Sequence, residues 1–287
     1  TIPGQVDTRI DSDADAYSGE LQHLFRTDRF NLVSGIGYWD IDAREITKFI
    51  TVTQPSRVAE SIRIDGDVQH YNAYLYANIE LPLHLIATIG GSYDDFDGDD
   101  DTPNREQFNP KLGLTWNPQP DTTLRVAAFR TLKRTLIADQ TIEPTQVAGF
   151  NQFYDDNNAS DIWSVGGAID QKFSASLFGG AEYYYRNLSA PYTVTTGGGD
   201  LGLRDAKWEE NVFRAYLFWT PHEWVSLTAE YLLEDFDRDE DSVDGAQKVT
   251  TQYIPLGVNL FHPSGFSAEL KGTHIYQNGD FERQGTT

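Results

Sequence analysis

The sequence contains no cysteine and no methionine among its 287 residues. The absence of cysteine excludes disulfide frameworks, zinc–thiolate sites, iron–sulfur clusters and cysteine nucleophiles. Methionine is missing even from position 1, so we expect the chain to be a mature or internal fragment. No stretch reaches the ~20 consecutive apolar residues of a transmembrane helix, and no signal peptide opens the chain.

Basic residues are also scarce. Lysine and arginine total 22 against 44 aspartates and glutamates, which gives a formal net charge of −22. This acidic surplus excludes a general nucleic-acid binder, because such a protein needs a basic face. Aromatic residues, in contrast, make up 13% of the chain, whereas disordered acidic chains are poor in aromatics. The composition therefore indicates a folded protein, either a soluble all-β protein or an outer-membrane β-barrel.

Apolar and polar residues alternate along almost the whole chain. In 71–81 the odd positions are tyrosine, alanine, leucine and isoleucine, and the residues between them are asparagine, tyrosine and glutamate. The same period of two recurs in 225–234, 253–261 and 266–276. Such alternation is typical of β-strands with two unlike faces, and no helical period extends over three turns. The pattern predicts an all-β fold.

The alternating runs pair into hairpins whose internal connections are short and carry turn residues. We predict the hairpins 17–26 with 29–39, 68–81 with 83–94, 106–117 with 121–134, 160–170 with 172–187, 206–219 with 223–236, and 246–261 with 264–276. The connections between hairpins are long and polar, at 40–67, 95–105, 135–159, 188–205 and 237–245. Outer-membrane barrels have this asymmetry, with short turns in the periplasm and long, here acidic, outer loops.

These observations predict an antiparallel, up-and-down transmembrane β-barrel over residues 17–287, preceded by a lead-in segment at 1–16. About 12 strands are visible, an even number that could already close. The chain ends without the terminal aromatic strand typical of bacterial barrels, so we expect C-terminal strands to be missing and a total of about 14 or more.

Aromatic residues gather near both ends of the predicted strands. Near the short turns lie Trp116, Trp219, Trp224, Phe261 and Phe266. At the opposite ends lie Trp39, Tyr93, Trp163, Tyr183, Tyr184, Tyr185 and Phe236. Two such belts are typical of membrane–water interfaces, although aromatics are favoured in strands of any sheet.

If the apolar face meets lipid, the alternate positions line a lumen. The charged residues at these positions are Glu80, Lys111, Arg125, Glu182, Arg214, Glu230, Glu234, Glu269 and Lys271. Their signs are mixed, so no strong selectivity for one ion follows. The alternative interpretation is that these charges pair across strands and have no other role.

One acidic loop is a candidate cation site. Carboxylates alternate in it at Asp95, Asp97, Asp99 and Asp101, and carboxylates are the ligands that Ca²⁺ prefers. The run does not match the twelve-residue calcium loop of helix–loop–helix proteins, and a solvated loop surface is the alternative. No other cofactor is expected.

The predicted loop 135–159 combines length with aromatic residues, namely Phe150, Phe153 and Tyr154. A loop of about 25 residues without regular structure is uncommon unless it functions. We expect it to fold inward over the barrel mouth, place its phenylalanines against Arg125 and Glu182, and constrict the pore. The alternative is a surface hairpin that extends the flanking strands.

Catalytic motifs are absent. The six histidines are scattered, and the sequence contains no Gly-x-Ser-x-Gly elbow, phosphate loop or His-Glu-x-x-His motif. We therefore predict that the protein is not an enzyme.

Two stretches resemble a known family. The sequence FNPKLGLTWNP at 108–118, followed by TLRVAAFR at 123–130, resembles a strand–turn–strand common in TonB-dependent receptor barrels. The segment TIEPTQVAGFNQF at 141–153 is similar to the receptor-like barrels at the C-terminal end of tetratricopeptide-repeat outer-membrane proteins. Only about 16 residues precede the first predicted strand, so we expect neither a plug domain nor a TonB box within this sequence, which departs from the receptor pattern.

The resemblance implies a porin-like or transport barrel in the outer membrane of a Gram-negative bacterium. We predict that it conducts or exports a solute or polymer, linked to a periplasmic repeat scaffold. Two alternatives stay open: a TonB-dependent uptake receptor barrel whose plug lies outside this fragment, and a structural or adhesive barrel with cation-binding acidic loops. The expected partners are outer-membrane lipid, lipopolysaccharide, a periplasmic repeat domain and other chains of an assembly, but not nucleic acid.

Overall fold

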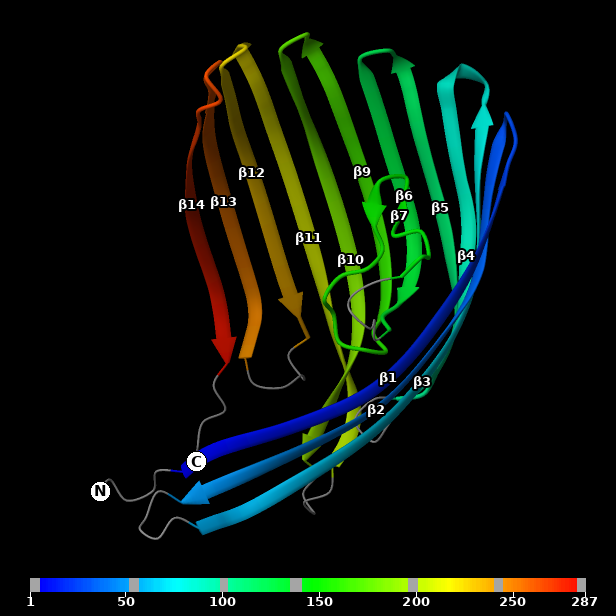
Figure 1. Ribbon diagram of the computed structural model, residues 1–287, viewed down its shortest axis with the longest axis vertical. Helices are drawn as coiled ribbons and strands as arrows, with labels where there is room; N and C mark the ends of the chain where they lie inside the picture. Colours follow the sequence, from blue (N-terminus) through cyan, green and yellow to red (C-terminus); the bar gives the residue numbers. More distant parts are fainter. Residues whose placement is uncertain are drawn as a thin grey trace.

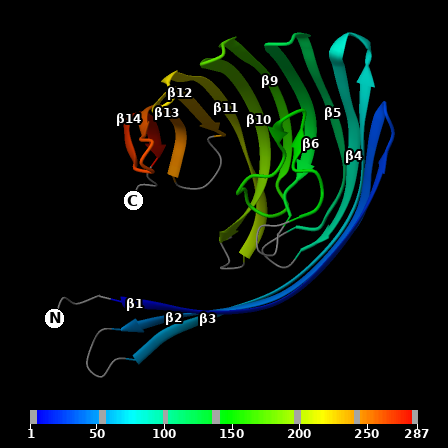
Figure 2. The same cartoon turned by 45° about the horizontal axis from the view of Figure 1, so that its top comes forward.

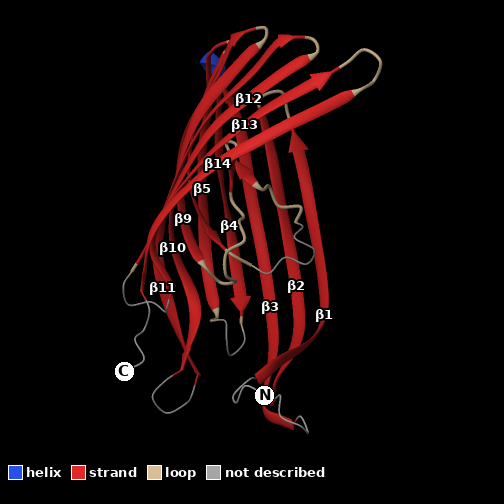
Figure 3. Cartoon of the chain, turned by 90° about the vertical axis from the view of Figure 1, so that its left-hand side faces the viewer, coloured by secondary structure: helices blue, strands red, loops and turns tan. Residues whose placement is uncertain are grey.

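A computed structural model describes residues 6–51, 57–98, 103–134, 141–195, 201–239 and 245–282. Nearly all of them lie in antiparallel strands, which confirms the all-β prediction (Figure 3). The main sheet has twelve strands that neighbour one another in chain order. They are β1 (Val6–Arg26), β2 (Phe30–Thr51), β3 (Arg57–Leu81), β4 (Leu85–Asp97), β5 (Arg105–Gln119), β6 (Thr122–Leu132), β9 (Asp161–Ser174), β10 (Leu177–Thr195), β11 (Leu201–His222), β12 (Val225–Arg238), β13 (Gly245–Phe261) and β14 (Ser267–Glu282).

All six predicted hairpins are present, with their short turns at one end of the sheet and the long connections at the other (Figure 1). The hairpin of β9 and β10 turns after Ser174, slightly later than predicted. Local chemistry closes the turns: the Thr27 hydroxyl accepts hydrogen bonds from the backbone N–H groups of Arg29 and Phe30. Within the described ranges no helix is long and apolar enough to cross a bilayer.

Several strands are longer than predicted. β1 begins at Val6, so most of the expected lead-in segment 1–16 is strand. β2, β3 and β10 likewise run through much of the expected loops 40–67 and 188–205. The backbone ladder satisfies N–H and C=O groups whatever the side chains are, so strands continue where the apolar alternation stops. Charged neighbours support this extension, as in the 3.0 Å contact between Lys48 Nζ and Asp11.

The sheet is strongly curved and has a concave and a convex face (Figure 2). Its two edge strands, β1 and β14, do not pair with each other within the part of the chain that the structure describes. The twelve described strands therefore form an open, barrel-like wall. These twelve strands do not close on themselves, and a total of about 14 or more strands stays a prediction.

The convex face carries a band of exposed apolar side chains bounded by aromatic residues. Near the short turns the band ends at Leu81 and Trp116, and towards the long connections it ends at Tyr71 and Tyr93. From residue 81 to residue 71 a strand rises ~33 Å, which a tilt of about 40° reduces to ~25 Å along the membrane normal. This height equals the apolar band of outer-membrane barrels.

Candidate functional site

The connection between β6 and β9 lies against the concave face of the sheet (Figures 1 and 2). Its described residues 141–160, here called the inner segment, contain two short strands, β7 (Gln146–Val147) and β8 (Phe150–Asn151). The turn between these strands has positive φ at Ala148 (46°) and Gly149 (87°), as a type I′ hairpin turn requires. The φ of Gly149 is one that residues other than glycine rarely adopt, and a Cβ there would also displace the end of the Arg125 side chain, so glycine is favoured at this position.

A row of small residues on three adjacent strands receives the tip of this hairpin. Gly113 on β5 pairs with Ala127 on β6, which pairs with Gly166 on β9. A Cβ at Gly166 would lie 2.4 Å from a ring carbon of Phe150, and a Cβ at Gly113 would lie 2.8 Å from Ala148 Cβ. Because these positions of the wall are glycine and alanine, they leave the space that the inner segment occupies.

Aromatic stacking holds the hairpin in this row. The ring of Phe150, which is 3% exposed, stacks on Tyr184 of β10 at a centroid distance of 5.9 Å. Tyr154 stacks on the same Tyr184 ring, also at 5.9 Å. The same buried cluster includes Tyr76 of β3 and Phe129 of β6. The segment is thus packed as a core is packed, with buried apolar contacts on strands from β3 to β10.

A buried ion pair anchors the segment to the wall. Arg134, directly after β6, donates to Glu143 of the inner segment at 2.8 Å, and both side chains are 1% exposed. The Tyr76 hydroxyl donates to the same carboxylate at 2.6 Å. The Gln152 amide donates to the Pro144 carbonyl at 2.7 Å. Buried charges are tolerated only when they are paired and hydrogen-bonded in this way.

A second buried carboxylate, Asp94 of β4, organises the wall beside this anchor. It accepts hydrogen bonds from the His70, Asn72 and Asn109 side chains at 2.9, 2.8 and 2.6 Å. Arg134 Nη1 lies 3.6 Å from Asp94, so this guanidinium has two carboxylates beside it.

The remaining faces of the Arg134 guanidinium are covered by aromatic rings. It lies 4.8 Å from the ring centroid of Trp39 on β2 and 5.0 Å from that of Phe153. Both distances are within the range of a cation–π contact. Strand β2 thereby joins the set of strands that hold the inner segment.

The two ends of the inner segment reach distant strands. At one end the Thr141 hydroxyl donates to Glu20 of β1 at 2.7 Å. At the other end Asp156 pairs with Arg186 of β10, whose guanidinium also lies 4.2 Å from the Tyr154 ring. Burial raises the pKa of the Asp156 carboxyl, and the guanidinium opposes that shift. The segment therefore crosses the concave face from β1 to β10.

Five of the predicted lumen residues lie among other polar and charged groups on the concave face. Arg125 contacts Asp170 at 3.0 Å and Glu182 at 3.4 Å. Arg214 donates to Glu230 at 2.7 Å. Lys111 is fully buried, with its ammonium donating to the Arg130 carbonyl. Four of these five charges therefore pair across strands, whereas Lys111 bonds to a backbone carbonyl.

The other four occupy the same face by register. Glu234 lies beside Val212, one pair beyond the Arg214 position along β11. Glu269 and Lys271 of β14 pair with Asn259 and Gly257 of β13. The side chains of Glu269 and Lys271 are exposed, and so is the side chain of Glu80, which lies near the short turns. The structure does not bring these four residues into one cluster.

The three aromatic residues expected at a constriction all lie on the inner segment, and each lies against a different arginine. Arg125 lies 5.4 Å from the Phe150 ring, as expected. Phe153 instead lies against Arg134. Tyr154 lies against Tyr184 and Arg186.

The candidate calcium site falls only in part on described residues. Asp95 and Asp97 lie on one face of β4, and Asp99 and Asp101 lie outside the described residues. Within the described ranges no group of three side chains is arranged to hold a metal ion. The calcium site stays a prediction.

Sequence reasoning missed the anchor of Arg134, Glu143 and Asp94. One signal was present: Glu143 is the only charged residue in the otherwise neutral stretch 141–153. A lone charge in an apolar and amide-rich segment indicates a buried partner of opposite sign. Nothing in the sequence names that partner.

Comparison with known proteins supports the same architecture. A family model described as TonB dependent receptor-like, beta-barrel, matches residues 2–158, which is more than half of the chain. No curated protein sequence matches the chain.

Three solved structures illustrate the likeness of fold. The ferripyoverdine receptor of the outer membrane of Pseudomonas aeruginosa superimposes with a TM-score of 0.57 at 10% identity, over 95% of this chain and 42% of that one. The FrpB iron transporter from Neisseria meningitidis gives 0.56 at 10% identity, over 95% and 48%. The alcaligin outer-membrane receptor from Bordetella pertussis gives 0.54 at 13% identity, over 95% and 54%.

The chain thus spans about half the length of these relatives. Its order of strands, its apolar convex band and the family match agree with one another. The chain belongs to the TonB-dependent receptor-like β-barrel family.

Proposed function

We propose that the protein forms the wall of an outer-membrane transport barrel of the receptor type, and that the inner segment narrows its passage. One observation carries the proposal: the inner segment is buried against the concave face from β1 to β10. A segment that extended the flanking strands at the surface would leave Val147 and Phe150 exposed, whereas their exposed fractions are 0% and 3%.

The cargo we propose is an iron-containing solute, by analogy with the ferripyoverdine receptor and the FrpB iron transporter. The concave face supports a polar cargo, because its charges of both signs keep the passage hydrated. Export of a polymer through a repeat-linked barrel and a structural role remain predictions, and no contact among the described residues favours either. That the protein is not an enzyme also stays a prediction.

Replacing residues 141–154 by a glycine–serine linker of equal length tests the constriction. We expect single-channel conductance in planar bilayers to rise, because the buried hairpin leaves the concave face. The matched control replaces only Gln146 and Asn151 by alanine, since both are exposed on the same hairpin and bond only to each other through their side chains. Unchanged conductance in the linker variant would sink the proposal.

A further inference from the structure

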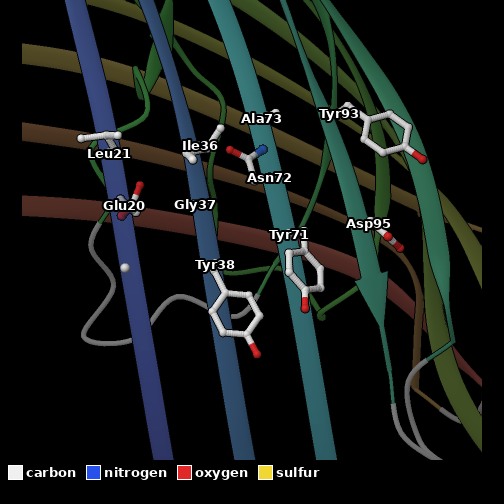
Figure 4. A pocket seen from close by; sticks show the side chains of 11 residues that line it. Glu20, Leu21, Ile36, Gly37, Tyr38, Tyr71, Asn72, Ala73, Tyr93 and Asp95 are labelled. Atoms are coloured by element: carbon white, nitrogen blue, oxygen red, sulfur yellow. The ribbon is translucent and has the colours of Figure 1, made fainter.

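The convex face holds a hollow of about 600 Å³ that crosses β1 to β4 (Figure 4). Small residues make its floor: a Cβ at Gly19 would meet no atom within 4 Å, and Ala73 lies nearby on β3. Three tyrosines, Tyr38, Tyr71 and Tyr93, stand around this floor. A cavity of this size is in the range of small-ligand sites.

The register of the strands places the hollow within the apolar band. Leu21, Ile36 and Ala73 are paired neighbours in one row of the convex face, and this row continues to Tyr93 on β4. The next row towards the long connections contains Tyr38 and Tyr71 and continues to Asp95. The hollow therefore lies where the lipid-facing band meets the aqueous interface on the long-loop side.

Hydrogen bonds fix the side chains of two of these three tyrosines. The Tyr38 hydroxyl donates to Asp40 at 2.6 Å, and the Tyr93 hydroxyl donates to Glu106 at 3.2 Å. The rings of Tyr38 and Tyr71 also contact each other, with centroids 4.8 Å apart. Tyrosine side chains fixed in this way cannot readily fold over the floor of the hollow, so the hollow is preorganised to accept an occupant.

We propose that this hollow binds one acyl chain of an outer-leaflet lipid. The lining supports an apolar chain, because leucine, isoleucine, alanine and the faces of tyrosine rings form it. Its position selects the occupant, since a lipid chain is what a cavity in the lipid-facing band meets. The carboxylate of Asp95 at the rim disfavours an unneutralised anionic headgroup there. The site lies on the face opposite to the inner segment and is independent of the proposed transport.

Native mass spectrometry tests the proposal on the chain refolded in detergent micelles and incubated with dioleoyl phosphatidylcholine, a zwitterionic probe. We expect one lipid to stay bound after the micelle has been removed. Ala73→Phe fills the floor and should abolish this adduct. Ala77→Phe is the matched control, because it places the same ring on the same convex face of β3, outside the hollow.

Gly19→Leu gives a second variant that fills the floor from β1, and circular dichroism checks that each variant keeps its strand content. Loss of the adduct in folded Ala73→Phe or Gly19→Leu, with retention in Ala77→Phe, supports the site. Retention of the adduct in both floor variants, loss in all three, or absence of any adduct on the unchanged chain would overturn it.

Discussion

Arg134 and Glu143 show at the scale of single residues how the inner segment is held. Their ion pair is almost fully excluded from water. Taking two charges out of water is expensive, and their attraction repays this cost only when the remaining hydrogen-bonding groups find partners. Tyr76 provides such a partner for Glu143 and Asp94 provides one for Arg134, although Arg134 Nε is buried without a hydrogen-bond partner among the described residues. The pair therefore constrains where the segment lies more than it adds to the net stability.

Glu143→Gln tests this view of the pair. The variant leaves the Arg134 charge buried without the carboxylate that contacts it at 2.8 Å, so we expect a loss of ~3 kcal/mol in unfolding free energy. Urea unfolding of the refolded protein measures it. Lys248→Met is the control, because it removes the exposed pair of Lys248 with Asp237, for which we expect less than about 1 kcal/mol. Equal losses in the two variants would contradict the assignment.

Gly166→Val tests the close approach of the inner segment to the wall. The added side chain would overlap the Phe150 ring, so we expect a loss of ~1–3 kcal/mol and faster proteolysis within the inner segment. The neighbouring Gly167 points to the convex face, where a Cβ would meet only Val126 at 4.0 Å. Gly167→Val should therefore leave both measurements nearly unchanged. A wild-type protease pattern in Gly166→Val would show that the segment does not depend on this row.

At the scale of elements, the inner segment is a mostly irregular connection that is fixed to the strands of the main sheet. Its hairpin of β7 and β8 supplies the buried apolar contacts, and its flanks supply the ion pairs at Glu143 and Asp156. Fixation at both flanks favours a static constriction over a lid that swings with each transport event. Local opening would require several buried contacts to break together.

A disulfide between the segment and the wall distinguishes a static constriction from a moving gate. The chain has no cysteine, so Gly113→Cys with Ala148→Cys introduces a single pair. A Cβ at Gly113 would lie 2.8 Å from that of Ala148, and a small outward shift brings it to the ~3.5–4.5 Å of a disulfide. We expect conductance to be the same with and without reductant. A reductant-dependent rise would mean that the segment moves during conduction.

At the scale of the whole molecule, the two faces of the curved sheet suit different solvents: the convex face suits lipid and the concave face suits water. The convex face has an apolar band of ~25 Å between aromatic rows, and the concave face carries paired charges. Because side chains alternate along each strand, a neighbouring position can belong to the opposite environment. The orientation of the wall in a membrane follows from this contrast.

Arginine substitutions on β13 test the orientation. Leu256 is 55% exposed on the convex face, whereas Asn259 belongs to the opposite face by strand alternation. Leu256→Arg near the bilayer midplane should destabilise the protein by ~2–4 kcal/mol in vesicles, and Asn259→Arg should be tolerated. Unfolding in lipid vesicles compares the two variants. Equal effects would mean that the faces are assigned the wrong way round.

Much of the architecture was already determined by the sequence. The period of two, the turn residues and the alternation of short and long connections are local properties, and they predicted twelve strands and six hairpins. Strand ends were underestimated at β1, β2 and β3, because outside the membrane a strand needs no apolar face. The expectation that Phe150 meets Arg125 also rested on a local signal, the density of aromatics in one long connection.

Only the tertiary structure decided how the inner segment is held. Glu20 and Thr141 are far apart in the chain, as are Tyr76 and Glu143, and no local pattern pairs them. The row of Gly113, Ala127 and Gly166 likewise exists only once the register of β5, β6 and β9 has been set. Periodicity reports which face a residue belongs to, whereas burial of a charge depends on which distant groups the curved sheet brings to it.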